Sequence, residues 1–166
     1  MSTAVAIREQ LSAALEAAQD GHIPDIERLL HKRGAFDQRF TIVIFAFAEV
    51  SRCVELMGSL VAIMEKADES RALIIQQVLV PDLARHEQVL RNRFGLSDAA
   101  DYLHSVRAAL GETNQDGLLE LSRDVASYFA FLNFMIAVQV PWNELSASFE
   151  GAQEIRASAS RRLVAI

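Results

Sequence analysis

The clearest pattern of apolar positions lies between Phe36 and Lys66. Apolar side chains recur there in alternating steps of four and three residues, at Phe36, Phe40, Val43, Phe47, Val50, Val54, Met57, Val61 and Met64. Such a seven-residue repeat keeps one seam of a helix against a partner, as in a left-handed bundle or coiled coil. A second apolar row widens this face, so we expect the long helix to have more than one neighbour; the row is Ile42, Phe45, Leu56 and Ile63.

A second apolar helix is predicted from Leu118 to Val140. It contains most of a nineteen-residue run without charge, Val125 to Asn143. A membrane span needs about 17 to 25 such residues, so this run is at the low end. It also contains polar side chains and lacks the flanking Lys/Arg cluster that normally orients a span. The sequence therefore makes a membrane helix unlikely and favours a helix buried on all sides in a soluble bundle.

Helix signals recur along the rest of the chain, whereas strand signals are nearly absent. Good helix formers and capping residues predict further helices at Ala4–Gln19, Pro24–Arg33, Asp68 or Ser70 to Val80, Asp82–Phe94, Ser97–Gly111 and about twenty residues from Pro141. Pro81 is expected to kink or break the chain of helices. The sequence thus predicts an all-α fold, a multi-helix bundle of six to eight helices around the two long apolar helices. We expect a single all-α domain over residues 1–166, in which an N-terminal helical pair, 1–34, packs on the body formed by 35–166.

Composition narrows the class of protein. Hydrophobic residues make up 51% of the 166 residues, which excludes intrinsic disorder, and the single cysteine, Cys53, excludes an intrachain disulfide. The net charge is −6, and the only local excess of basic residues lies near the C-terminus, so we expect no nucleic-acid partner. The first residues contain no apolar run long enough for a signal peptide, which predicts a cytoplasmic protein.

The two apolar helices also predict self-association. Apolar side chains between Tyr128 and Ile136 cover every direction around the second helix, which a small monomer has difficulty burying. Large exposed apolar patches are uncommon on soluble monomers. We therefore expect a homo-oligomer, a dimer, that buries the surplus face, and a different protein partner is a further interpretation.

Three polar residues, Glu49, His86 and Asn133, fall where the surrounding pattern is apolar. Buried carboxylates and amides need hydrogen-bonding partners, so these side chains could converge on one polar pocket in an otherwise apolar core. Such a pocket is the usual form of a small-ligand site. The sequence thus indicates a candidate ligand-binding pocket lined by Phe45, Glu49, His86, Phe129 and Asn133.

Each of these polar residues has a purely structural alternative. Glu49 could pair with Arg52 one turn later at the surface, and Asn133 could fix helix register, as a lone core Asn does in coiled coils. His86 could be a core histidine bonded to a backbone carbonyl or a carboxylate. Cys53 is interpreted as a small core residue, since no His lies near it in sequence.

The segment His104-Ser-Val-Arg107-Ala-Ala-Leu-Gly111 resembles the phosphorylated helix of histidine phosphotransfer domains. In that family an exposed His is followed by a basic residue at +3 and by Gly at +4, a position that Ala108 occupies here. The resemblance implies phosphotransfer at His104, with Arg107 steadying the phosphoryl group. The alternative is a solvated histidine between Asp101 and Arg107.

The segment Leu83-Ala-Arg-His86, which follows a long Phe-rich helix, resembles the proximal-histidine helix of globins. The resemblance implies haem as an alternative cofactor, although no distal residue is identifiable. A carboxylate-bridged di-iron site is not expected, because no Glu-x-x-His occurs. The leading interpretation includes no cofactor and no metal.

No complete catalytic constellation occurs in the sequence, and no glycine-rich phosphate loop is present. The leading functional hypothesis is therefore a non-catalytic helical protein that acts by protein interaction or regulation as a homodimer. The alternatives are a bundle that binds a small apolar ligand or cofactor near Glu49, His86 and Asn133, and histidine phosphotransfer at His104.

Overall fold

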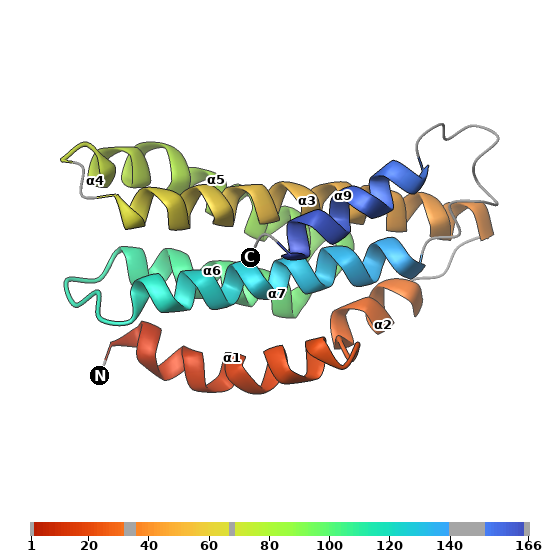
Figure 1. Cartoon of the computed structure of the whole chain (residues 1–166), viewed down its shortest axis with the longest axis horizontal. Coiled ribbons are helices and arrows are strands. Elements are labelled where there is room, and N and C mark those ends of the chain that lie inside the picture. The colour runs from red at the N-terminus through yellow and green to blue at the C-terminus, as the bar shows by residue number, and fades with distance from the viewer. Residues whose placement is uncertain (1, 32–35, 67–68, 140–151, 165–166) are drawn as a thin grey trace.

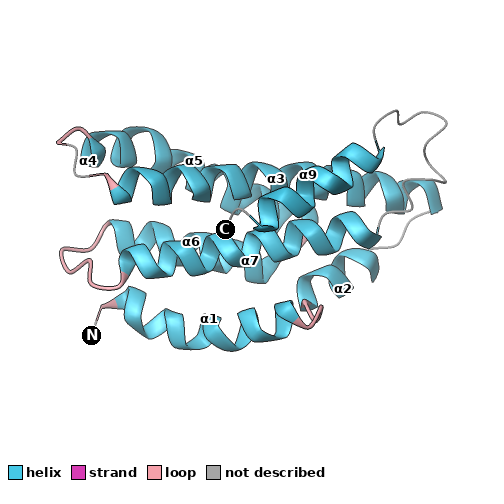
Figure 2. Cartoon of the chain, in the orientation of Figure 1, coloured by secondary structure: helices cyan, strands magenta, loops and turns pink. Residues whose placement is uncertain are grey.

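The computed structural model describes residues 2–31, 36–66, 69–139 and 152–164 of the chain. Every regular element in these residues is helical, so the predicted all-α multi-helix bundle is confirmed (Figure 2). Taking α4 through η2 as one continuous helix, the described residues form seven helices. In chain order the elements are α1 (Thr3–Gln19), α2 (Pro24–His31), α3 (Phe36–Glu65), α4 (Arg71–Ile74), the π-helical η1 (Ile75–Leu79), α5 (Val80–Val89), the π-helical η2 (Leu90–Phe94), α6 (Ser97–Leu110), α7 (Leu118–Gln139) and α9 (Ala152–Val164).

Helix α7 lies at the centre of the bundle, where it contacts α1, α3, α6 and α9. Figure 1 shows α3 and α7 running side by side along the long axis, with α1 on the opposite side of α7 from α3. Helix α5 packs on α6 and also reaches α3. The contact between α3 and α5 is the one that builds the candidate site.

The seven-residue seam of α3 faces the interior of the chain. Its members Val43, Val50, Val54 and Met57 are buried, and the side chains of the first two members, at 36 and 40, lie outside the described ones. The contact between α3 and α7 is the most extensive among the described helices. The heptad seam of α3 thus packs against α7 of the same chain. The homodimer stays a prediction.

Of the two long helices, α7 is the clearly apolar one. It is the one described helix that is long and apolar enough to cross a membrane, by length and composition alone. Within its most apolar window 61% of the residues are buried inside the bundle, as in the core helix of a helical domain. Helix α3, by contrast, exposes charged side chains such as Arg52 and Glu55 on its outer side. The prediction of two long apolar helices is therefore corrected to one clearly apolar long helix, α7.

The predicted break at Pro81 takes a different form. The backbone stays helical from Arg71 to Phe94, with a π-helical turn just before α5 and another just after it. Pro81 stands in the first turn of α5, where the missing amide hydrogen removes one α-helical bond. A π-helical turn accommodates such an interruption without ending the helix.

Helix ends follow the predicted signals where they are described. Gly95 ends η2 with a left-handed φ of 67°, and the Leu96 amide donates to the Leu90 carbonyl at 2.9 Å. The start of the helix predicted at Pro141 lies outside the described residues, and α9 is described from Ala152.

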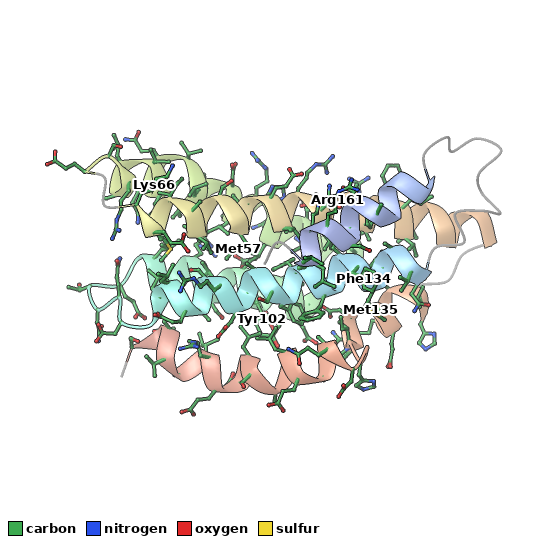
Figure 3. The ribbon with its side chains drawn as sticks, in the orientation of Figure 1. Met57, Lys66, Tyr102, Phe134, Met135 and Arg161 are labelled. Atoms are coloured by element: carbon green, nitrogen blue, oxygen red, sulfur yellow. The ribbon has the colours of Figure 1, made fainter. Side chains whose placement is uncertain are left out.

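An aromatic contact joins α6 and α7, and Figure 3 labels its α6 member, Tyr102. The rings of Tyr102 and Tyr128 meet edge to face, with centroids 4.7 Å apart and planes at 69°. Burial raises the pKa of both phenols, so both hydroxyls stay protonated at neutral pH.

Asp25 fastens α2 to the start of α6. Its carboxylate, which is fully buried, accepts hydrogen bonds from the amides of Asp98 (3.3 Å) and Ala99 (2.9 Å). These amides belong to the first turn of α6, where backbone donors have no partner within the helix. Arg28 lies 3.2 Å from the same carboxylate. One side chain therefore caps a helix that is distant in sequence and connects α2 to α6.

We predict that Asp25→Ala lowers the free energy of unfolding by about 1 to 2 kcal/mol, because two first-turn amides of α6 lose their acceptor. Chemical denaturation followed by circular dichroism measures this change. Glu27→Ala is the matched control, since Glu27 lies on the same helix with its side chain 63% exposed, and its effect should stay within about 0.5 kcal/mol. Equal effects of the two variants would contradict the capping role.

Candidate functional site

Glu49 and His86 meet in the space between α3 and α5. Glu49 is buried and His86 is mostly buried, with side-chain exposures of 6% and 13%. The Nδ1 atom of His86 contacts Oε1 of Glu49. The two residues that interrupt the apolar pattern on different helices are thus direct partners.

The second oxygen of Glu49 has a partner on its own helix. Arg52, one turn later, places Nη1 at 3.3 Å from Oε2 of Glu49, and its side chain is 62% exposed. Glu49 therefore makes both contacts at once: it pairs with Arg52, as the structural alternative proposed, and it also contacts His86. The Glu49 carboxylate joins a buried histidine on one side to a solvated cation on the other.

The electrostatics of Glu49 reflect both partners. Burial acts to raise its pKa, but the hydrogen bond and charge of His86, together with Arg52, outweigh burial and hold the pKa below its usual range. Glu49 therefore stays ionised at neutral pH, so the bundle encloses a carboxylate in its interior.

Cys53 completes this group. It lies four residues after Glu49 on the same face of α3, and it is fully buried. The Sγ atom of Cys53, a carboxylate oxygen of Glu49 and a ring nitrogen of His86 all lie within 4.8 Å of one another. Burial, reinforced by the Glu49 charge, raises the pKa of the thiol well above its ordinary value. We refer to Glu49, Cys53 and His86 as the Glu–Cys–His cluster.

Sequence reasoning missed Cys53 as a member of the site. The available signal was its i, i+4 spacing from Glu49, which places both side chains on one helical face. No local pattern could add His86, which belongs to another helix.

The helix that carries His86 has an unusual setting. Helix α5 is bounded on both sides by π-helical turns, η1 and η2. Each π-helical turn changes the rotation of the residues that follow, and such turns are frequent at functional sites. The first of these turns, η1, precedes His86, whose side chain contacts Glu49 of α3.

Asn133, the third polar residue of the predicted pocket, lies in a different group. Its side-chain amide donates to Ser51 Oγ at 2.8 Å and lies 3.5 Å from the Phe47 carbonyl oxygen, while its buried Oδ1 has no hydrogen-bond partner among the described residues. Arg162 of α9 also donates to Ser51 Oγ, at 3.4 Å. Since Ser51 is two residues from Glu49, about 200° around the helix, this second cluster faces away from the first. The three polar residues therefore do not converge on one pocket: Glu49 and His86 form one group, and Asn133 belongs to another.

The two aromatic residues of the predicted pocket also separate. Phe129 is fully buried in the core, with its ring edge to face against Tyr128. Phe45 is 52% exposed, and the guanidinium of Arg93 lies 5.7 Å from its ring centre. Glu49 and His86 are the pair that the structure brings together from the predicted set.

His104 lies on the outer side of α6, with its side chain 56% exposed. Its Nδ1 atom is 3.1 Å from Oε1 of Glu87 on α5, and the Arg107 guanidinium donates to the same carboxylate at 3.0 Å. Arg107 Nη2 is also 3.1 Å from His104 Nδ1. The exposed histidine and its neighbouring cation are thus as the sequence suggested, and Glu87 orients both.

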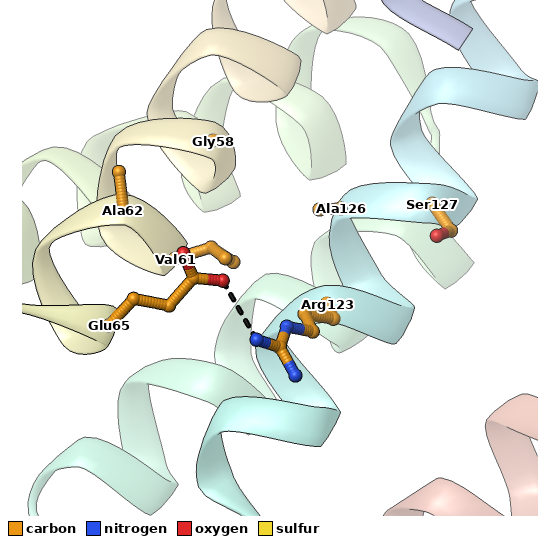
Figure 4. A pocket seen from close by; sticks show the side chains of 7 residues that line it. All are labelled: Gly58, Val61, Ala62, Glu65, Arg123, Ala126 and Ser127. Carbon is orange, nitrogen blue, oxygen red and sulfur yellow. Dashed lines mark hydrogen bonds and ion pairs between the residues drawn. The ribbon is translucent and has the colours of Figure 1, made fainter. Parts of the chain in front are cut away.

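A surface cavity of about 340 Å³ lies between α3 and α7 (Figure 4). Small side chains form its floor, and Glu65 and Arg123 point toward each other across one end with a 2.8 Å ion pair. Its lining residues are Gly58, Val61, Ala62, Glu65, Arg123, Ala126 and Ser127. None of the predicted site residues belongs to it.

We predict strong coupling between Glu49 and His86 in a double-mutant cycle. Glu49→Leu or His86→Leu alone should lower the free energy of unfolding by about 2 to 4 kcal/mol, because the first leaves Nδ1 of His86 and the second leaves Oε1 of Glu49 without its buried partner. The double variant should be close to the wild type, since it leaves neither group unpaired. Urea denaturation measures all four proteins.

The control cycle uses Glu55→Leu and His104→Leu, whose side chains are exposed and contact different residues. Their effects should add to within about 0.5 kcal/mol. Additive losses for Glu49 and His86 as well would show that their contact is energetically irrelevant.

Comparison with protein-family models, with curated proteins and with solved structures found no match for this chain.

Proposed function

We propose that this protein is a non-catalytic regulatory protein whose helical bundle binds a small ligand at the contact between Glu49 and His86. The observation that supports this most is the burial of the charged Glu49 carboxylate against His86 at the contact between α3 and α5. A buried pair of this kind is a poor way to stabilise a fold, because desolvation offsets most of the attraction and apolar residues of similar size do as well or better. Perturbed groups of this kind cluster at functional sites.

The position of the pair also suits a regulatory role. Helix α5 belongs to a helical arm, α4 through η2, and the pair joins this arm to the long central helix α3. A ligand that binds between the two helices would change the strength of their connection. Binding at one site would then alter the surface that the arm presents to other molecules.

We also propose that the protein self-associates. The heptad seam of α3 is used within the chain, so other apolar side chains would form the contact between copies. The apolar side chains still exposed among the described residues would supply the contact; they are Phe45, Leu73, Ile74, Val78, Val138 and Val164.

Ligand binding is tested by thermal denaturation against four ligand classes: haem, a fatty acid, small organic anions and divalent metal ions. At about 100 times the dissociation constant, a bound ligand should raise the melting temperature by roughly 5 to 10 °C. The variant with both Glu49→Leu and His86→Leu should lose this shift while remaining folded. If no class shifts the wild type more than this double variant, the proposal fails.

Phosphotransfer at His104 is a second candidate, favoured by the exposed imidazole whose Nδ1 faces Glu87. This orientation leaves Nε2 as the nitrogen that would attack the phosphorus of an aspartyl phosphate on a response regulator, with the carboxylate as leaving group. We expect acid-labile, base-stable labelling from a phosphorylated regulator, and loss of the label in His104→Ala. His31→Ala, also exposed, is the control, and label that persists in His104→Ala would exclude this site.

A further inference from the structure

We propose that the ligand of the core site is a divalent transition-metal ion of the zinc class, held by Glu49, Cys53 and His86. This inference rests on the proposed function, because it names the chemistry of the ligand at the same place. It adds Cys53 as a binding residue and commits to a metal ion over an organic molecule.

The geometry is close to that of a metal site. Three donor atoms from two helices lie within 4.8 Å of one another. A four-coordinate zinc ion with bonds of its usual lengths holds neighbouring donor atoms about 3.4 to 3.6 Å apart. Side-chain movements of about 1 Å or less would therefore bring the three donor atoms to the spacing that a zinc ion requires, without a change in helix packing.

The donor chemistry selects the class of metal. Calcium and magnesium prefer oxygen ligands alone, whereas a thiolate, an imidazole and a carboxylate together suit zinc or cobalt. Three protein ligands leave a fourth position for water or another small molecule, as in zinc sites that are not purely structural.

The charge balance also fits a buried ion. On coordination the Cys53 thiol releases its proton to solvent and forms a sulfur–metal bond. The Nδ1 atom of His86, which donates to Glu49 Oε1 in the metal-free site, gives up its proton as well, either to solvent or to Nε2 of the same ring, and then binds the metal as a neutral imidazole. A divalent ion with one thiolate, one carboxylate and a neutral imidazole carries no net charge, which lowers the cost of burial. Arg52, on the other oxygen of Glu49, would orient that ligand from outside.

The experiment uses the full-length protein after removal of bound metal with a chelator. Titration with Co²⁺ should give a near-ultraviolet thiolate-to-cobalt charge-transfer band, and Zn²⁺ should displace the cobalt. Cys53→Ser and Cys53→Ala should both lose the band. Two different substitutions are used so that the result does not depend on one variant that fails to fold. Glu49→Gln and His86→Asn should weaken Zn²⁺ affinity by roughly 100-fold or more, since loss of a direct ligand exceeds the 10-fold to 100-fold effect of an outer contact.

Two exposed residues supply matched controls: Glu55→Gln on the same helix, and His22→Asn, with wild-type side-chain exposures of 70% and 69%. Both should bind Co²⁺ and Zn²⁺ as the wild type does. Absence of Co²⁺ and Zn²⁺ binding, or an unchanged band in both Cys53 variants, would overturn the metal site. If haem, a fatty acid or an organic anion then still shifted the wild type but not the double leucine variant, the proposed function would survive without the metal. If none of these ligands shifted the wild type either, both the metal site and the proposed ligand-binding function would fail.

Discussion

The packing of α3 against α7 is the interaction on which the rest of the bundle depends. Val50, Met57 and Leu60 of α3 and Leu121, Phe129 and Leu132 of α7 are almost fully buried, and close packing of such side chains supplies most of the driving force for folding. The other helices cover the faces that this pair leaves open, with α1, α6 and α9 on α7 and α5 on α3. The same packing fixes the rotation of α3, so it decides which of its polar residues points towards α5.

Polar residues inside this apolar core serve three different purposes. Asp25 satisfies the free amides at the start of α6 and therefore has a clear structural role. Asn133 and Ser51 join α3 and α7 through a short polar cluster, which limits how the two helices can slide. Glu49 and His86 lack such a structural explanation. Neither side chain caps a helix end, and apolar residues at the same two positions would pack α5 against α3 equally well. That difference makes the Glu–Cys–His cluster the strongest candidate for function.

The arm from α4 through η2 shows how a local irregularity can create a site. Pro81 interrupts α-helical hydrogen bonding, and the π-helical turn η1 just before it keeps the backbone helical there. In a regular helix the rotation of His86 would follow directly from the residue count. Here the π-helical turn η1, which precedes His86, holds more residues than an α-helical turn and so shifts that rotation, and His86 contacts Glu49.

The helical class, the approximate helix bounds and most of the buried positions follow from the sequence alone, because apolar periodicity and helix-ending residues act over a few turns of one segment. The sequence also singled out Glu49, His86 and Asn133 as polar residues in apolar surroundings. The contacts of His86 with Glu49 and Cys53, and of Asn133 with Ser51, became visible once the helices were seen packed together. The reason is physical: contacts between helices depend on their relative rotation and neighbours, which non-local packing sets and local periodicity does not encode. The same reason explains why the heptad seam, which signals a partner helix, could not say that this partner is α7 of the same chain.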